Sequence, residues 1–396
     1  MKFLKSSLLS AAAVIVASQA SAADLEVTHW WTSGGEAAAV AEFAKAFDAT
    51  EHTWIDGAIA GSGGTARPII ISRILGGDPM HATQLNHGRQ AEELVEAGLM
   101  LDLSDIAAEG GWADVVNPSR LLDSCTLDGK VYCVPVNIHS PQWLWLSHDA
   151  FAKAGLDVPS DWFEFVAAAP ALREAGVVPL AMGQQAWQTD LAFGAIQVAV
   201  GGTDLYLDVL TNKNADAAAS AEMTKVFEAY ADARLLSVGS NVNDWNQATN
   251  LVITGQAGGQ IHGDWAQGEF QVANQVAGED YTCLPGLGVN EIIATGGDAF
   301  YFPKQDDPAI EAAQKELAQL MISKEVQVAF NLKKGSLPIR GDVDLSAAND
   351  CMKKGLSILA AGNVLPDGVN AFSADTAGQM ADLMVEFWND TSITVA

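Results

Sequence analysis

The sequence predicts an α/β protein built from two domains, and three observations support this prediction. Strand and helix patterns alternate from residue 24 to residue 98, and such alternation implies a parallel sheet with right-handed crossovers. The chain has 396 residues, which is more than one α/β domain usually needs. Its hydrophobic fraction of 49% is sufficient for two cores.

The alternation is clearest in the N-terminal part of the chain. Val40, Phe43 and Phe47 recur at helical spacing and form one apolar face of an amphipathic helix. The segment from Gly76 to Pro79 ends a later helix, with glycine at the cap and proline just beyond it. The elements expected here are strands at 24–29, 53–59 and 82–85 and helices at 34–48, around 70–75 and at 89–96.

The rest of the chain combines long helical stretches with a few short strands. Residues 99–125 lack a regular pattern, and Asp128-Gly129 indicates a hairpin turn. Trp143 and Trp145 alternate along a strand, so at least one of them is expected to be buried. The other expectations are strands at 142–146, 258–262 and 292–302, helices near 151 and 160, a largely helical stretch over 171–260, a helix at 309–330, a tight loop at 333–338 and a helix at 377–388.

The first 22 residues have the pattern of a secretory signal peptide. Lys2 and Lys5 form a basic region, residues 8–17 form an apolar core, and Ala20-Ser21-Ala22 fits a cleavage site. No later segment reaches the roughly 18 apolar residues that a spanning helix needs, and no cysteine follows the cleavage point to carry a lipid. We therefore expect cleavage after Ala22 and export of a soluble protein.

The chain is strongly acidic. It has 49 Asp and Glu against 21 Lys and Arg, a formal charge of −28, and loss of the leader removes two lysines and no acid. Such a charge repels nucleic acid and anionic membranes, and it provides no general attraction for an anionic ligand. We therefore expect no nucleic-acid or membrane-surface partner and assign the acidic surface to solubility.

The four cysteines of an exported chain are expected to pair. Cys125 and Cys133 stand equally far from the hairpin turn and should face each other, so we expect a Cys125–Cys133 disulfide. Cys283 and Cys351 then pair by elimination. The C-x-x-C spacing of many metal sites is absent from the sequence.

The most informative stretch is a strand-to-helix turn at residues 29–36 with two adjacent tryptophans. Trp30 and Trp31 offer flat apolar faces for the C–H face of a pyranose, while backbone N–H groups and Glu36 can bond its hydroxyls. A structural interpretation competes with this one. Ser33-x-x-Glu36 fits a capping box, in which Glu36 reaches back to its own backbone, and one of the indoles must be partly core.

Other candidate residues also follow the ends of expected strands. They are Gln84 and Asn86, His139, and the pair Asp264 and Trp265. In open α/β sheets ligands bind outside the carboxyl ends of the strands, so we expect these side chains to converge. Taken singly, each is more often structural, because most tryptophans belong to cores and most isolated histidines to hydrogen-bond networks.

Other kinds of site have little support. Residues 61–66 match the G-x-G-x-x-A spacing of dinucleotide-binding loops, but they do not follow the first strand, and free NAD is scarce outside the cell. The seven histidines are scattered, so we expect no metal and no cofactor. Glu36, Asp264 and Asp298 do leave open an exported glycoside-active enzyme, because glycoside hydrolysis needs two carboxylates across a sugar.

Five short motifs together carry a family resemblance. They are Trp30-Trp31 before a helix, Gly76 to Pro79 before a strand, Val134-Pro135-Val136-Asn137-Ile138-His139, Gly263-Asp264-Trp265, and Lys334-Gly335-Ser336. With them the mature chain resembles the periplasmic glucose/mannose-type sugar-binding proteins of bacterial ABC importers, within extracellular solute-binding protein family 1. Gly-Asp-Trp is common across that family, whereas Trp-Trp with Val-Pro-Val-Asn-Ile-His is narrower and indicates its monosaccharide branch.

The resemblance implies a type II, Venus-flytrap binding-protein fold. Two α/β lobes with mixed sheets flanked by helices would close on a ligand about a hinge. The expected lobes are 23–137 plus 266–326 for the N-terminal one and 138–265 plus 327–396 for the C-terminal one. The chain would cross between them near 136–141, 262–266 and 326–334.

The resemblance also implies a ligand site. The positions that line the glucose pocket in the similar proteins correspond here to Trp30, Trp31, Glu36, Gln84, Asn86, Asp298 and Lys334. From the strand ends and the additional indoles we add His139, Trp245, Asp264 and Trp265. Lys334 placed against Glu36 or Asp298 would make the pocket neutral in charge.

Three departures from the family pattern bear on which sugar would bind. Asn86 stands where the pattern has His, Gly296 has no side chain that can bond, and Ala361 lies where a late His is missing. Fewer hydroxyl contacts than in a glucose site leave room for a different or larger sugar, or for a polyol.

The sequence therefore predicts the periplasmic, monomeric substrate-binding component of an ABC sugar importer. Its expected partners are a neutral mono- or disaccharide and the permease subunits in the inner membrane, and no catalytic residue is expected. The exported glycoside-active enzyme is the alternative. A structural or adhesion module is disfavoured because the sequence shows no internal repeat.

Overall fold

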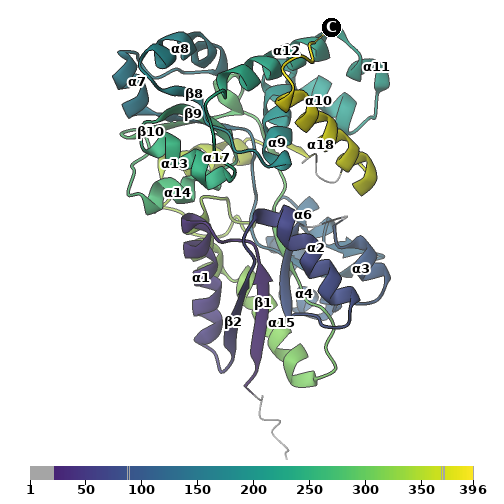
Figure 1. The fold of residues 1–396 in the computed structure, drawn as a ribbon. Helices are drawn as coiled ribbons and strands as arrows, with labels where there is room; N and C mark the ends of the chain where they lie inside the picture. Colours follow the sequence, from purple (N-terminus) through teal and green to yellow (C-terminus); the bar gives the residue numbers. More distant parts are fainter. Residues whose placement is uncertain (1–21, 87, 89, 367, 369–370, 396) are drawn as a thin grey trace, which may run out of the picture.

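The protein forms two lobes connected by several chain segments (Figure 1). The computed structural model describes residues 22–395 apart from 87, 89, 367, 369 and 370. The expected signal peptide, up to residue 21, thus lies outside the described residues. The purple N-terminal segment belongs to one lobe, and the teal middle of the chain belongs to the other.

The first lobe is built on a five-stranded mixed sheet. Its strands are β1 (Asp24–His29), β2 (Thr53–Ala58), β3 (Ala82–Asn86), β6 (Cys133–Pro135) and β12 (Asp298–Tyr301). They lie in the order β2-β1-β3-β12-β6, in which β1 is parallel to β2 and β3 while β12 is antiparallel to β3 and β6. The expected parallel pairing is confirmed for the first three strands, and a strand that returns late in the chain makes the sheet mixed.

The helices of the first lobe are α1 (Gly34–Asp48), α2 (Ser62–Leu75), α3 (Glu92–Glu96), α4 (Ser104–Glu109), α5 (Trp112–Val115), α6 (Arg120–Asp123), α15 (Pro308–Ile322) and α16 (Lys324–Lys334). Three of them, α4, α5 and α6, lie within residues 99–125, where the expectation of irregular structure is wrong. The single helix expected at 309–330 is wrong, because the extended backbone of Ser323 (φ −64°, ψ 154°) separates two helices. The second helix also includes Lys334, which we expected in a loop.

The second lobe is built on a four-stranded sheet. Its strands are β7 (Trp143–Ser147), β8 (Val178–Leu180), β9 (Ala257–His262) and β10 (Tyr281–Pro285), in the order β10-β7-β9-β8. β7 is antiparallel to both of its neighbours, and β8 is parallel to β9.

The second lobe also carries most of the helices. They are α7 (His148–Ala154), α8 (Trp162–Glu174), α9 (Ala186–Ile196), the π-helical turn η1 (Gln197–Gly201), α10 (Gly202–Leu210), α11 (Ala215–Ala218), α12 (Ala221–Leu236), α13 (Trp245–Ile253), α14 (Ala266–Val272), η2 (Gly286–Gly288), α17 (Asp350–Ala360) and α18 (Ala374–Asn389). The Ala-rich helical stretch expected over 171–260 is confirmed in outline.

The lobes exchange segments at places that differ from the expected boundaries. β10 belongs to the second sheet, although 266–326 was assigned to the first lobe. Phe330 of α16 packs on Trp31 in the first core, although residues from 327 on were assigned to the second lobe. Backbone pairing with β7 explains the place of β10, and burial of an apolar face explains that of α16.

The strand expected at 292–302 is interrupted where the chain passes between the lobes. β11 (Ile293–Thr295) pairs with β13 (Val364–Pro366), and β12 begins only after Gly297. A Cβ at Gly297 would lie 2.3 Å from the carbonyl oxygen of Asn137, so the two connecting backbones touch there. The 136–141 connection joins β6 to β7, as expected.

Each lobe has its own hydrophobic core. In the first, the expected apolar face of α1 is buried, and Phe43 stacks on Phe330 with 4.3 Å between ring centroids. In the second, α8, α9 and α12 cover the sheet around Phe165, Ile196 and Tyr230. No helix within the described residues is long and apolar enough to cross a membrane.

The lobes also touch where α1 meets α14. A Cβ at Gly35 would lie 2.5 Å from the backbone of Gly268, so neither a methyl group nor anything larger fits between the two helices. The N–H of Gly35 donates to Glu269 Oε1 at 2.7 Å, which satisfies one free donor of the α1 N-terminus.

Both expected disulfides are present. Cys125–Cys133 closes the hairpin of β4 (Thr126–Leu127) and β5 (Lys130–Val131), with Cα atoms 5.0 Å apart. Cys283–Cys351 ties β10 to α17 across 68 residues of sequence. The second bridge therefore fastens the late α17 segment onto the second sheet.

Removing the Cys283–Cys351 bridge should destabilise the second lobe. Replacing both cysteines by alanine frees a long loop in the unfolded chain, and such losses typically cost about 2–4 kcal/mol. Thermal unfolding should show a lower Tm for this variant, and dithiothreitol should lower the wild-type Tm in the same direction. An unchanged Tm in the double variant would contradict the assignment of a stabilising role.

Candidate functional site

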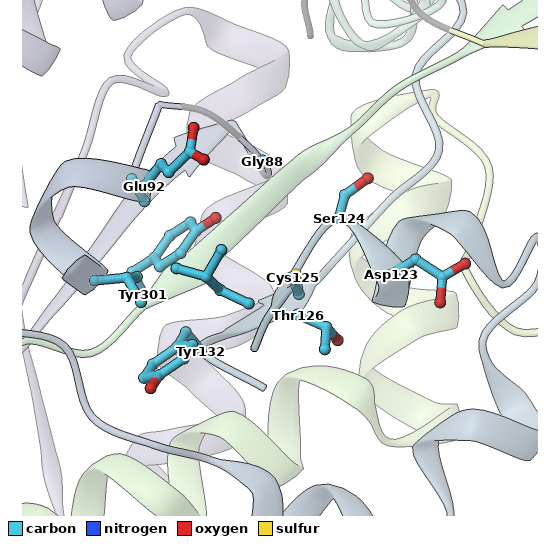
Figure 2. A pocket seen from close by; sticks show the side chains of 11 residues that line it. Gly88, Glu92, Asp123, Ser124, Cys125, Thr126, Tyr132 and Tyr301 are labelled. Atoms are coloured by element: carbon cyan, nitrogen blue, oxygen red, sulfur yellow. The ribbon is translucent and has the colours of Figure 1, made fainter. Parts of the chain in front are cut away.

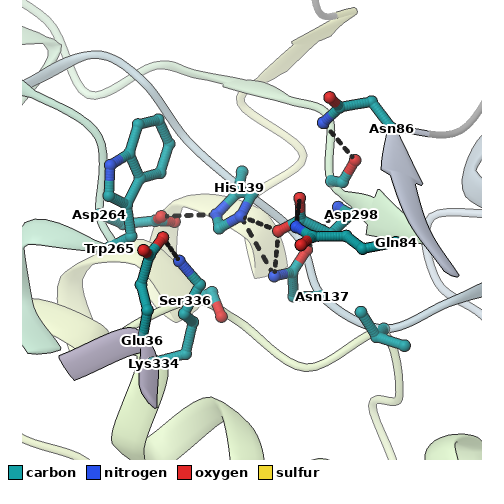
Figure 3. A network of polar contacts seen from close by, with 12 residues as sticks. Glu36, Gln84, Asn86, Asn137, His139, Asp264, Trp265, Asp298, Lys334 and Ser336 are labelled. Atoms are coloured by element: carbon teal, nitrogen blue, oxygen red, sulfur yellow. Dashed lines mark hydrogen bonds and ion pairs between the residues drawn. The ribbon is translucent and has the colours of Figure 1, made fainter. Parts of the chain in front are cut away.

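A buried network of polar side chains joins the two lobes (Figure 3). Its centre is His139, which lies on the 136–141 connection between the two sheets. His139 Nδ1 contacts Asp264 Oδ1 at 3.1 Å, and His139 Nε2 forms a short contact with Asp298 Oδ2. Asp264 follows a strand of the second sheet, and Asp298 begins a strand of the first, so the imidazole connects carboxylates from both lobes.

Asp298 is held by four contacts from three residues. Gln84 Nε2 donates to Oδ1 at 2.9 Å, and Asn137 Nδ2 donates to Oδ2 at 3.0 Å. The backbone N–H of Asp298 donates to Asn137 Oδ1 at 2.8 Å, and His139 supplies the fourth contact. In the antiparallel pairing of β12 with β3, Asp298 lies opposite Asn86, and this register brings its carboxylate close to Gln84.

The electrostatics of the network favour a protonated His139. Burial opposes the imidazolium, but the charge of Asp298 and the hydrogen bonds to both aspartates outweigh it and raise the pKa of His139 to about 9. Burial likewise opposes the Asp298 carboxylate, and the charge and hydrogen bond of His139 hold its pKa well below the usual range. Burial raises the pKa of Asp264, with His139 opposing that effect.

A second buried ion pair lies next to this network. Lys334 Nζ donates to Glu36 Oε1 at 2.9 Å, and the hydroxyl of Ser33 donates to Glu36 Oε2 at 3.2 Å. Burial raises the pKa of Glu36, with Lys334 opposing. The capping-box interpretation is half correct, because Ser33 caps α1 while Glu36 turns to Lys334 instead of its own backbone.

Aromatic side chains of the second lobe border the network. Trp265 stands edge-on to His139 with 4.8 Å between ring centroids, and its Nε1 donates to His262 Nε2 at 2.7 Å. Trp187 lies 5.4 Å from His262 and 6.4 Å from Trp265, between ring centroids. Burial, together with the charges of Lys334 and His139, lowers the pKa of His262 to about 3, so this imidazole stays neutral and accepts the indole N–H.

Gly263 explains why Gly-Asp-Trp places its indole here. A Cβ at Gly263 would lie 2.1 Å from Trp265 Cζ3, because the ring folds back over the glycine. Any side chain at this position would displace the indole, so the position of the Trp265 ring requires glycine at residue 263.

Two of the expected ligand residues are mainly structural. Trp31 is 1% exposed and packs among Phe43, Phe300 and Phe330, although Lys334 Nζ lies 5.5 Å from its ring centroid. Trp245 is 4% exposed and stacks on His262 in a separate apolar cluster of the second lobe, with Trp143 and Trp145. Both indoles therefore support the site from behind.

Trp30 and Asn86 meet a residue that the sequence did not single out. The guanidinium carbon of Arg67 lies 5.7 Å from the centroid of the partly exposed Trp30 ring. Arg67 Nη1 donates to Asn86 Oδ1 at 3.1 Å, and Asn86 Nδ2 donates to the carbonyl of Gly297 at 3.4 Å. The three side chains thus form one cluster on the first lobe.

Other departures from the family pattern are also visible. Gly296 contributes its backbone, because its carbonyl accepts from the N–H of His139 at 3.0 Å. Ala361 is exposed at the end of α17.

Across the lobes, the hydroxyl of Ser62 lies 3.5 Å from Gln185 Oε1, so the N-termini of α2 and α9 face each other.

Residues missed by the sequence reasoning are Arg67, Asn137, Ser62 and Gln185. Asn137 lay within the Val-Pro-Val-Asn-Ile-His motif and two residues before His139, a spacing that places both side chains on one face of an extended segment. Arg67 carried no comparable signal, because its reach across α2 to Asn86 depends on the fold.

A separate hollow lies within the first lobe (Figure 2). This cavity of about 190 Å³ is lined by residues around the Cys125–Cys133 disulfide, including Glu92, Asp123 and Tyr301. None of the expected ligand residues lines it. Within the described residues, no group of three or more His, Cys, Asp or Glu side chains could hold a metal ion.

The comparisons with known proteins identify the family. A family model described as bacterial extracellular solute-binding protein matches residues 31–328. The chain belongs to this family. It is a family of binding proteins, so the glycoside-active enzyme is no longer supported.

Relatives and solved structures that resemble this chain agree with this family. A probable sugar-binding periplasmic protein of Rhizobium meliloti (strain 1021) is 34% identical over 369 residues, covering 91% of this chain and 87% of the relative. A structure from work on xylan utilisation by Caldanaerobius polysaccharolyticus has a TM-score of 0.78 at 19% identity, covering 94% of this chain and 97% of the other. The solute receptor AcbH, described as preferring β-D-galactopyranose, has a TM-score of 0.74 at 21% identity, covering 94% and 95%. The two-lobe α/β binding-protein fold is therefore confirmed.

Replacing Gly263 by alanine should disturb the aromatic cluster. The added methyl group overlaps Trp265, and such overpacking typically costs about 1–3 kcal/mol. The near-UV circular dichroism of the tryptophans should change, and the urea midpoint should fall. Gly341→Ala is the matched control, because a Cβ there meets nothing within 4 Å; equal effects of both changes would contradict the argument.

The stability of the protein should decrease as the pH rises toward 9. The pKa of His139 is about 9 in the fold against an ordinary value of 6.5, so the stabilisation is fully present below pH 6.5 and is lost as the pH passes 9. Urea unfolding at pH 6, 8 and 9.5 should show this loss in the wild type and in His148→Gln. His139→Gln should have a flatter profile, and an identical slope in all three proteins would refute the role of His139.

Proposed function

We propose that this protein is the periplasmic substrate-binding component of an ABC sugar importer, and that it binds a neutral mono- or disaccharide between its lobes. The observation that supports this most is the interlobe network centred on His139, bordered by the partly exposed indoles of Trp187 and Trp265. Its chemistry suits a sugar, which needs hydrogen-bond partners for its hydroxyls and apolar surface for its C–H faces. Curated relatives named as sugar-binding periplasmic proteins support the same class of ligand.

The proposed site combines side chains from both lobes. Trp30 and Asn86 come from the first lobe, Trp265 and Asp264 from the second, and His139 from the connection. Glu36, Gln84, Asp298 and Lys334 form the polar floor, and Trp31 and Trp245 support it from the two cores.

Binding would act through a population shift between open and closed lobe arrangements. A ligand that contacts both lobes favours the closed arrangement, and it can shift the equilibrium only by its difference in affinity for the two states. The closed pair of lobes would then present a composite surface to the permease subunits. A micromolar dissociation constant corresponds to about 8 kcal/mol, which ring stacking and several charge-assisted hydrogen bonds can provide.

We also propose the maturation and organisation that go with this role. Cleavage after Ala22 would release the chain into the periplasm as a monomer. The first lobe would contain residues 23–137 together with β12, α15 and α16, and the second would contain β7 to β10 with α18. α17 would bridge the two, because Met352 packs in the first core while Cys351 is bonded to Cys283 of the second sheet.

A panel of neutral sugars tests the function directly. Thermal-shift and tryptophan-fluorescence titrations with aldoses, disaccharides and polyols should give at least one saturable, one-to-one response, with the sugar recovered unchanged. Trp187→Ala should weaken that binding about tenfold or more, since burying an aromatic face contributes about 1.5–3 kcal/mol. Trp388→Ala, at a partly buried indole that packs on Tyr230, is the control and should bind as the wild type does. Absence of binding across the whole panel would refute the proposal.

A further inference from the structure

Within the proposed sugar site, most polar side chains of the first lobe already have partners. Gln84 accepts from the N–H of Trp30 at 3.1 Å and donates to Asp298. Asn86 accepts from Arg67 and donates to Gly297. Both oxygens of Asp298 accept hydrogen bonds, and both oxygens of Glu36 do the same. Gln84, Asp298 and Glu36 are also almost fully buried, so the groups placed to offer new bonds to a ligand are those with unused donors and exposed surface.

Arg67 has both unused donors and exposed surface. A guanidinium has five N–H donors in a fixed plane, and within the described residues Arg67 uses one nitrogen, Nη1, for its bond to Asn86. No carboxylate of the described residues forms an ion pair with it. Lys334 also has spare donors, but its side chain is only 2% exposed, whereas Arg67 is partly exposed.

The position of Arg67 is fixed from three sides. The ring of Trp30 lies beneath the guanidinium, and Asn86 holds Nη1. A Cβ at Gly63 would lie 3.2 Å from the guanidinium carbon and 3.3 Å from Trp30 Cε2, so the first turn of α2 packs closely on both groups. An arginine held in this way loses little rotamer entropy when a ligand binds.

The charges of the site favour a neutral ligand at Arg67. Arg67, His139 and Lys334 are cationic side chains, and Glu36, Asp264 and Asp298 are carboxylates, so the charges compensate without a ligand. Burial lowers the pKa of the Arg67 guanidinium, and the negative charge of Asp298 partly offsets this effect. An added carboxylate would leave an excess negative charge close to Asp298.

We propose that Arg67 is a specificity-determining ligand residue, whose free Nε and Nη2 edge binds two adjacent hydroxyl oxygens of a neutral sugar. This inference rests on the proposed sugar-binding function. Asn86 then acts as a positioning residue, because its amide oxygen accepts from Nη1 and orients the guanidinium. The Nε and Nη2 edge would read a vicinal diol, because its two N–H groups lie side by side in the plane of the guanidinium.

The first arm of the test compares variants on the same helix. The best-binding neutral sugar from the panel is titrated calorimetrically against wild type, Arg67→Met, Arg67→Lys and Arg73→Met. Arg73 is the matched control, because it lies on α2 but pairs with Glu26 at 2.6 Å. Arg67→Met should weaken binding about 10- to 100-fold, since hydrogen bonds to a charged group are strong, and Arg67→Lys should not restore it. Arg73→Met should bind like the wild type.

The second arm asks which oxygens Arg67 contacts. Monodeoxy analogues of the same sugar are titrated against wild type and Arg67→Met, or Arg67→Lys if the methionine variant does not fold. Two adjacent deoxy positions should each weaken binding to the wild type but have little effect in the variant. The corresponding uronate should bind the wild type less tightly than the neutral sugar.

The outcomes separate this inference from the proposed function. If Arg67→Met binds the neutral sugar within twofold of the wild type, or if the uronate binds more tightly, the inference is wrong while the sugar-binding function stands. If deoxygenation weakens the variant as much as the wild type, Arg67 does not contact those oxygens. If neither the wild type nor Arg73→Met binds any sugar, the proposed function itself fails, and the inference fails with it.

Discussion

The imidazole of His139 is the constraint on which the interlobe structure depends. Two carboxylates, Asp264 and Asp298, are nearly completely buried where the lobes meet, and a buried charge is tolerated only when it is paired and hydrogen-bonded. One side chain on a connecting segment pairs with both. The relative position of the two sheets at this point is thereby tied to the geometry of one five-membered ring.

The residues of the site fall into two groups, buried ones that support the site and exposed ones that are free to contact a ligand. Gln84 and Asp298 bond each other, and Glu36 bonds Lys334 and Ser33, so these groups form a rigid polar floor. Trp31 and Trp245 fill the cores on either side of that floor. Groups with exposed surface or unused donors, such as Trp187, Trp265 and Arg67, are then left to meet a ligand. A site organised in this way can change its specificity at the edge without disturbing the buried charges.

Much of the fold could be predicted from the sequence because the signals were local. The apolar spacing of Val40, Phe43 and Phe47 defined α1, and the Asp128-Gly129 turn placed Cys125 opposite Cys133. The lobe boundaries could not be predicted in the same way. Whether β10 joins one sheet or the other depends on pairing with β7, a contact that spans more than a hundred residues.

The candidate site shows the same limit. Strand ends indicated that Gln84, His139 and Asp264 would converge, and the structure places them in one network. Asp298 was indicated by the family resemblance alone, because it begins an antiparallel strand. Periodicity cannot distinguish an indole that faces a ligand from one that packs behind it, which is why Trp31 was assigned to the ligand. Arg67 was missed because its role arises from a helix that crosses over Trp30.

The contact between Gly35 and Gly268 has a consequence for how the protein can evolve. Two helices, one from each lobe, meet there backbone to backbone, with an anchoring carboxylate from Glu269 beside them. A single methyl group at Gly35 would push the two helices apart where the lobes meet. We therefore expect this position to remain glycine in related sequences, although it lies outside the proposed ligand contacts. The reason would be the close packing of two helices and not contact with a solute.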